Sequence, residues 1–112
     1  MMIQNLTPHD IVIRTATGDV KLPPCGQVAR VATIPGKPIG EFEGIHLFSA
    51  PEFGEVAGLP APEEGVIFIV SALVAQRCIG RKDVFSPDTG PTAIREGGQI
   101  VAVKGLVQAP QE

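Results

Sequence analysis

Glycine and proline punctuate this chain along its whole length. Of its 112 residues, 13 are glycine and 11 are proline, roughly twice the usual share of these two residue types. Proline breaks helix interiors and cannot donate to a central sheet ladder, whereas glycine favours turns. We therefore predict a mainly β fold, a compact small β-barrel or sandwich built from many short strands with one short helix.

The length and the apolar content bound the domain organisation. A chain of 112 residues makes one domain, and we predict a single β-rich domain over residues 1–107 with a frayed tail over 108–112. With 44% hydrophobic and 19% charged residues, the chain is too apolar to be disordered. A small domain with this apolar content cannot bury all of its apolar side chains, and the exposed ones are available to a partner. We therefore expect a homo-oligomer.

Charge and hydropathy narrow the expected partners and location. A net charge of −3 disfavours binding to a nucleic acid duplex, which needs a cationic face to displace counterions. The longest nearly uninterrupted apolar run, Val66 to Ala75, is well below the roughly 18 residues of a transmembrane helix. The first ten residues, MMIQNLTPHD, lack the basic and hydrophobic regions of a secretory signal. We expect no membrane partner and a cytoplasmic location.

Apolar alternation predicts the individual strands. Residues 10–22 read as a hairpin that turns at Thr17, Gly18 and Asp19 and is stopped by two prolines. Residues 34–43 hold two prolines and two glycines, which indicates a long loop. The further strand candidates are Gln27–Thr33, Gly44–Ser49, Glu55–Leu59, Val66–Val70 and Ile94–Val107. Val66–Val70 is apolar on both faces and is predicted to be the central buried strand.

One short helix is predicted directly after that strand. Ser71 is a suitable N-cap, and the residues from Ala72 to Cys78 contain neither glycine nor proline. Gly80 then provides a stop signal. The prediction is a helix of about two turns.

A dense polar cluster follows the helix and is the first candidate binding site. Arg81 and Lys82 are donors suited to phosphate, Asp83 can accept from ribose hydroxyls, and Phe85 can stack on a base. Ser86 and Thr89 add hydroxyl groups beside Pro87 and Gly90. The predicted ligand is an anionic small molecule such as a cyclic nucleotide or an ADP-ribose derivative. The same residue types also build ordinary exposed turns, so both interpretations stay open.

A second polar turn lies near the N-terminus, at Asn5, Thr7 and His9. One interpretation is a capped turn that sets the register of the hairpin after it, because Thr7 or Asp10 can bond local backbone groups. The other is that this turn forms the rim of the pocket that contains Arg81 and Asp83.

Common enzyme motifs are not found in the sequence. There is no GxGxxG, P-loop, HExxH or GxSxG pattern. Cys25 and Cys78 are far apart and have no metal-ligand spacing, so we expect two reduced, partly or wholly buried thiols. We predict no catalytic residue, no metal site and no cofactor, and we lean against an enzyme.

Three stretches, NLTPHDIVI, GEVAGLPAPEEGVIFIVSALVA and RKDVFSPDTGP, carry a resemblance to a known family. The chain resembles small uncharacterised phage and prophage proteins that open with an NLTPH motif. The matching positions are Asn5–His9, Gly58–Pro60, Ile69–Ser71, Arg81, Asp83 and Pro87. The resemblance implies a phage-type protein that works in the cytoplasm of an infected bacterium, and it assigns no catalytic role.

Three functions follow from these observations as hypotheses. The first is a non-enzymatic protein that sequesters a nucleotide-like signalling molecule of host immunity. The second is a virion structural or decoration protein, or one that binds a host protein. In that case Arg81 and Asp83 pair only with each other and hold a turn. The third is a nucleotide hydrolase.

Overall fold

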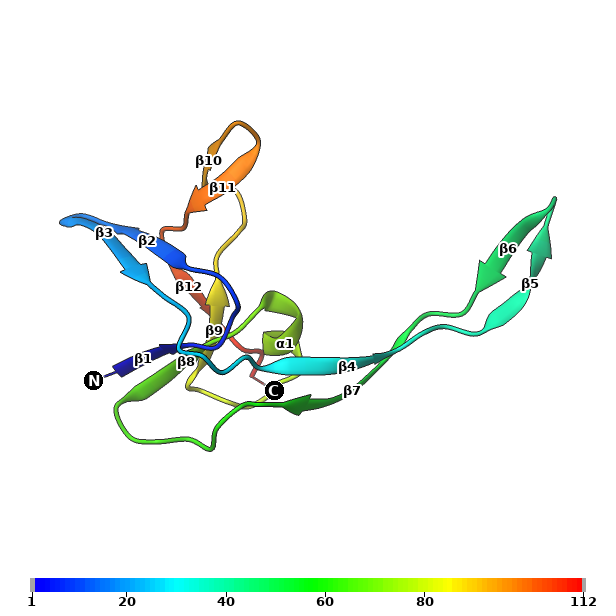
Figure 1. The fold of residues 1–112 in the computed structure, drawn as a ribbon, viewed down its shortest axis with the longest axis horizontal. Helices are drawn as coiled ribbons and strands as arrows, with labels where there is room; N and C mark the ends of the chain where they lie inside the picture. Colours follow the sequence, from blue (N-terminus) through cyan, green and yellow to red (C-terminus); the bar gives the residue numbers. More distant parts are fainter. Residues whose placement is uncertain (1, 112) are drawn as a thin grey trace.

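The computed structural model describes residues 2–111 and shows a small body from which a long arm projects (Figure 1). Its principal extents are 56 × 37 × 28 Å and its radius of gyration is 17.0 Å. A compact domain of this length has a radius of gyration of about 13 Å. We define the arm as residues 35–51, which carry β5 (Pro38–Phe42) and β6 (Ile45–Phe48). The remaining described residues form the body.

A four-stranded sheet organises the body. Its order is β1 (Met2–Asn5), β8 (Val66–Ile69), β9 (Val84–Pro87) and β12 (Leu106–Gln108). The first three strands are parallel and β12 is antiparallel to β9. Helix α1 (Ala72–Gln76) connects β8 to β9, and the Ser71 side chain accepts a hydrogen bond from the Val74 amide at its N-terminus. The predicted helix, its cap and the central strand are thus confirmed.

The core occupies both faces of this sheet because successive residues of a strand point to opposite faces. Phe68, Val70 and Val84 pack with Val74 and Ala75 of α1 in one buried cluster. Ile69, on the other face, packs with Ile11, Ala93 and Val103 in a second buried cluster.

Three antiparallel pairs surround the sheet. They are β2 (Ile11–Thr15) with β3 (Gly18–Leu22), β4 (Arg30–Ile34) with β7 (Glu52–Ala57), and β10 (Ile94–Glu96) with β11 (Gln99–Ala102). The first confirms the predicted hairpin over residues 10–22, but its turn lies at Ala16 and Thr17 rather than at Thr17, Gly18 and Asp19, because Gly18 and Asp19 already pair with Thr15 and Arg14 in the ladder. Within residues 2–111 no sheet closes into a barrel. The fold is mainly β with one short helix, but the prediction of a compact barrel or sandwich is wrong, because the strands form several small separate sheets.

The C-terminal third differs most from its prediction. Ile94–Val107 is three strands rather than one, because Gly97 and Gly98 both have positive φ, at 59° and 82°, as a two-residue hairpin turn requires. The expected frayed tail also differs from the structure. Gln108 belongs to β12, Ala109 is buried, and the Ala109 amide donates to the Val84 carbonyl. Residue 112 lies outside the described range.

The arm replaces the loop predicted over residues 34–43. A two-residue turn joins β5 to β6, and both of its residues, Glu43 and Gly44, have positive φ. Neither strand contains a buried residue. The structure of residues 2–111 contains one helix, α1, whose five residues are too few to cross a membrane.

Candidate functional site

Arg81 and Asp83, central to the predicted binding cluster, bond to each other. Nε and Nη2 of Arg81 donate to the two carboxylate oxygens of Asp83, at 2.8 and 2.9 Å. Nη2 also donates to the Pro60 carbonyl at 3.1 Å. The side chains are only 25% and 17% exposed. The guanidinium donors that could bind a phosphate are therefore used within the chain. They join the β8–β9 connection to the segment that precedes β8.

This pairing shifts the titration of both groups. The hydrogen bonds to Arg81 hold the pKa of Asp83 below its ordinary value, and the same bonds to Asp83 raise the pKa of Arg81. Both groups are therefore charged across the neutral range.

Replacement of Asp83 by asparagine tests the contribution of the pair. Because Asp83 binds a proton more weakly in the folded than in the unfolded chain, its contribution is complete above its ordinary pKa. It is lost as the pH falls through its lowered folded pKa. We expect Asp83→Asn to lower the free energy of unfolding at pH 7 by about 1–3 kcal/mol and to weaken its dependence on pH in the acid range. Urea unfolding at a series of pH values measures both.

Asp19→Asn is the matched control, since Asp19 forms the same bidentate contact with Arg14 on an exposed hairpin. Solvent screening makes such exposed pairs weak, so this variant should unfold much as the parent protein does. Equal effects of the two substitutions would contradict the structural role of the Arg81–Asp83 pair.

Asn5 organises the N-terminal turn. It is buried, and its Nδ2 donates to the carbonyls of His9 and Leu22, both at 2.8 Å. Its Oδ1 accepts from the amide of Thr7 at 2.9 Å and from the Thr7 hydroxyl at 2.6 Å. Thr7 is buried as well, whereas the His9 residue is exposed. These contacts are those of a capped turn that positions the β2–β3 hairpin.

The rest of the polar cluster is partly a sheet strand. Ser86 is buried in β9 opposite Val107, and Phe85 is half-buried beside Ile69. Lys82 and Thr89 flank this strand and are exposed. Lys82 and Thr89 also offer their backbone carbonyls to the side chains of Gln108 and Arg95. The exposed loop predicted from Arg81 to Thr89 therefore contains one of the inner strands of the sheet.

The predicted binding residues line four different hollows, the smallest of which, of about 180 Å³, is lined by Thr89 and by Asp10 just before β2. Thr7 lines one of about 220 Å³, between the N-terminal turn and α1. Arg81 lines a second, of about 470 Å³. Ser86 and Thr89 line a third, of about 260 Å³, on the other side of α1. Asp10 thus meets Thr89, but the hollow beside Arg81 contains no residue of the N-terminal turn, so the shared pocket with Arg81 that one interpretation of the sequence required is not formed.

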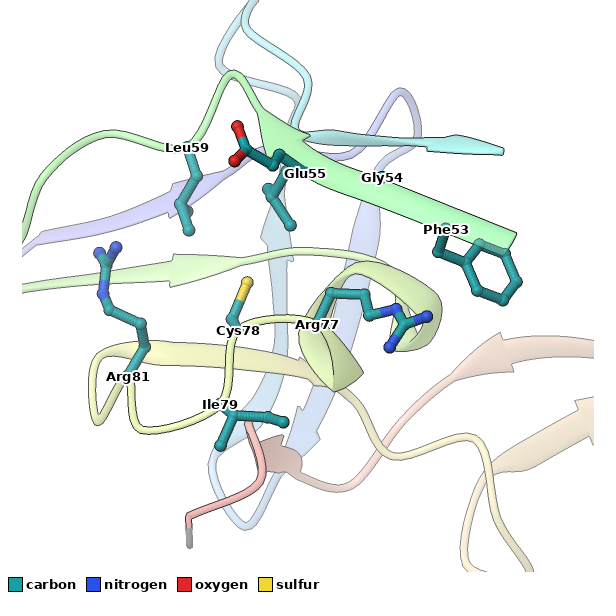
Figure 2. Close-up of a pocket in the computed structure, with 9 residues that line it drawn as sticks. Phe53, Gly54, Glu55, Leu59, Arg77, Cys78, Ile79 and Arg81 are labelled. Carbon is teal, nitrogen blue, oxygen red and sulfur yellow. The ribbon is translucent and has the colours of Figure 1, made fainter. Parts of the chain in front are cut away.

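The hollow beside Arg81 contains residues that the sequence did not single out (Figure 2). It lies between β7 and the end of α1. The Arg77 guanidinium stands 4.8 Å from the centre of the Phe53 ring, a cation–π arrangement. Phe53 lies in β7 and Arg77 directly follows α1, 24 positions later, so no local pattern indicated their contact.

The chemistry of this hollow is not nucleophilic. The Cys78 thiol donates to the Val74 carbonyl at 3.2 Å, and burial raises the pKa of this thiol. It is therefore protonated at neutral pH, and a thiol in that form is a poor nucleophile. Both cysteines are free, as predicted, but Cys25 is exposed rather than buried. Among residues 2–111 no three His, Cys, Asp or Glu side chains gather as a metal site would need.

The arm carries five large apolar side chains that are exposed, those of Ile39, Phe42, Ile45, Leu47 and Phe48. Phe42 is 64% exposed, Ile45 is 61% exposed and Leu47 is 40% exposed. Phe42 pairs with Ile45, and Leu47 pairs with Gly40 two positions along. Residues paired across a ladder, and residues two apart in a strand, share one face. These three side chains therefore form one face, which we call the apolar arm face.

The opposite face of the arm is partly charged. Glu41 pairs with His46, and their side chains approach to 3.3 Å. Since they lie one position away from Phe42 and Ile45, they point to the other side of the hairpin. Phe48, two positions from His46, lies on this face as well and is 61% exposed. Both faces of the arm therefore carry exposed apolar side chains, although the arm packs on nothing within its own chain.

Comparisons with protein-family models, with curated proteins and with solved structures give no match. The function must therefore be inferred from the chemistry of these surfaces.

Proposed function

We propose that this protein is a non-enzymatic structural or interaction protein that assembles with copies of itself through the apolar arm face. The observation that carries the proposal is an ordered hairpin with Phe42, Ile45 and Leu47 on one face, outside any core. Burial of an apolar side chain of this size contributes about 1.5–3 kcal/mol. A partner that covers three such side chains therefore gains a large favourable contribution to its binding free energy.

The total surface of the chain supports assembly. The structure exposes 7680 Å², whereas a compact folded monomer of this mass exposes about 5,900 Å². The excess of roughly 1,800 Å² per chain can be compared with the roughly 800 Å² that each partner buries in a standard interface. A subunit of a larger assembly has this kind of surface.

The internal bonding of the polar cluster supports the same proposal. In a structural or interaction protein, Arg81 and Asp83 need only hold a turn. Their bidentate pair of hydrogen bonds does this. A virion component is the form of this function that the resemblance to phage and prophage proteins favours.

The mass of the native protein in solution tests the proposal. We expect light scattering on a size-exclusion column, together with native mass spectrometry, to give a multiple of the 11.7 kDa chain mass at micromolar concentration. A protein that stays at the chain mass across the accessible concentrations would refute it.

Sequestration of an anionic, nucleotide-like molecule is a second proposal, supported by the hollow that Arg77 lines, in which Arg81 is already bonded to Asp83. Its volume of about 470 Å³ is in the range of small-ligand sites, and Arg77 has no carboxylate partner among the described ion pairs. A cyclic nucleotide or ADP-ribose derivative that raises the melting temperature, and returns unchanged on heating, would support it. Arg77→Gln should abolish the shift. No shift across such a panel would remove this proposal.

A further inference from the structure

A second apolar surface lies on the body, where β1 and β8 begin. Met2 is 55% exposed and Ile3 is 43% exposed, and both line a hollow of about 380 Å³ with Gly65, Val66 and Ile67. None of these residues is charged. We call this surface the acceptor patch.

The acceptor patch is also an open sheet edge. β1 is an outer strand of the four-stranded sheet. The amides of Met2 and Leu6 donate to carbonyls of the β8 segment. Because backbone groups alternate along a strand, the amide and carbonyl of Ile3 point away from β8, toward the open side. An open edge of this kind can accept a strand from another chain.

The apolar arm face and the acceptor patch lie at opposite ends of the molecule. Figure 1 shows β5 and β6 at one end of the long axis and β1 at the other. An arm therefore cannot reach the patch of its own chain, but it can reach the patch of another copy. Contact between two different surfaces of identical chains is heterologous, and it produces a ring or an open helical array.

Electrostatics permit this docking on one side of the arm. Because Glu41 and His46 are on the face opposite Phe42 and Ile45, the apolar arm face can be covered without burial of the Glu41 carboxylate. Burial of a charged group without a partner would cost several kcal/mol.

We propose that the apolar arm face of one copy docks on the acceptor patch of the next copy, so that the chains join head to tail. This inference rests on the proposed assembly function and names its second surface. Pairing of two arms with each other would leave the acceptor patch in solvent. Head-to-tail contact covers both surfaces of every internal copy, and the roughly 1,800 Å² that the chain exposes beyond a compact monomer exceeds the roughly 800 Å² that each partner buries in one standard interface.

Mixing two defective variants tests the proposal. The donor-defective variant carries Phe42→Asp and Ile45→Asp, and the acceptor-defective variant carries Met2→Asp and Ile3→Asp. We expect each alone to be monomeric, and a one-to-one mixture to form a heterodimer of about twice 11.7 kDa, because it keeps one intact arm and one intact patch. Val20→Asp, an exposed β3 residue outside both surfaces, is the control and should assemble as the parent does.

The outcomes separate the two proposals. A monomeric parent protein would refute the assembly function itself. An assembling parent together with an acceptor-defective variant that keeps the parental size, as arm-to-arm pairing would give, would overturn only the head-to-tail contact. A mixture that stays monomeric while both variants show the parental circular dichroism spectrum would overturn it too.

Cross-linking provides a measurement that needs no disruptive substitution. In chains that carry Cys25→Ser, one copy receives Leu47→Cys and the other receives Ile3→Cys. We expect a mixed disulfide between these two copies under mild oxidation. A chain with Val20→Cys in place of Ile3→Cys should not cross-link, and equal yields from both pairs would overturn the proposal.

Discussion

Excision of the arm is expected to leave a folded, monomeric body. In this variant an Asn-Gly dipeptide replaces residues 35–51 and joins Ile34 to Glu52, which already face each other in the β4–β7 ladder. Asn-Gly suits the two-residue turn of a β-hairpin. Because β5 and β6 contain no buried residue, the body should keep its two core clusters while the assembly disappears.

Light scattering, circular dichroism and thermal melting measure this result. Full-length protein with Lys37→Ala, an exposed arm residue outside the apolar arm face, is the control and should assemble normally. An excised variant that keeps the parental oligomeric mass would show that the body alone assembles. An excised variant that fails to fold would contradict the independence of the body from the arm.

Replacement of Asn5 by alanine is expected to cause the largest loss of stability among single polar substitutions. The variant loses four hydrogen bonds. The Leu22 carbonyl loses its Asn5 donor, whereas the His9 carbonyl keeps the Thr7 hydroxyl at 3.1 Å. A buried group left unsatisfied costs about 1–3 kcal/mol, so we expect a total loss of about 3 kcal/mol. In a domain of this size the melting temperature should fall by about 10 °C or more.

Two neighbouring variants sharpen this test. Asn5→Asp keeps the acceptor for Thr7 but puts a carboxylate oxygen where Nδ2 donates to two carbonyls, so its melting temperature should be no higher than that of the alanine variant. Gln4→Ala, at the preceding position, should melt close to the parent, since the recorded contact of the Gln4 side chain is an exposed one to Met2. An Asn5→Ala variant that melts like the parent would show that other contacts hold the turn.

The parts of the fold that were predictable depend on local chemistry. Ser71 caps α1 because a serine oxygen can bond the amide three residues on. The run from Val66 to Val70 is apolar at every position, and a strand of that kind is buried on both faces. Neither inference needs knowledge of distant residues.

The parts that were missed depend on distant pairing. β9 contains a proline and the polar Ser86, and it becomes an inner strand only because β8 and β12 flank it. The arm was missed for a different reason. Large apolar side chains such as Phe42 and Ile45 are usually expected in a core, and the prolines and glycines around them indicate a loop. Neither signal predicts an exposed hairpin.

The candidate binding residues show a similar ambiguity. Arg81, Asp83 and Asn5 were chosen because they can donate and accept hydrogen bonds, and in the structure they do so with other groups of the chain. The sequence identifies bonding capacity, but only the folded chain reveals which partner uses it.

The order of the sheet also has a consequence for how the protein is made. β1 pairs with β8, more than sixty residues later, and β9 and β12 follow later still. The sheet therefore cannot close until most of the chain has left the ribosome. The β5–β6 hairpin needs only neighbouring residues, and hairpins form in microseconds. The residues of the arm thus emerge before those of β8, β9 and β12, and since an isolated hairpin is only marginally stable in water, the arm gains stability when its apolar side chains are covered.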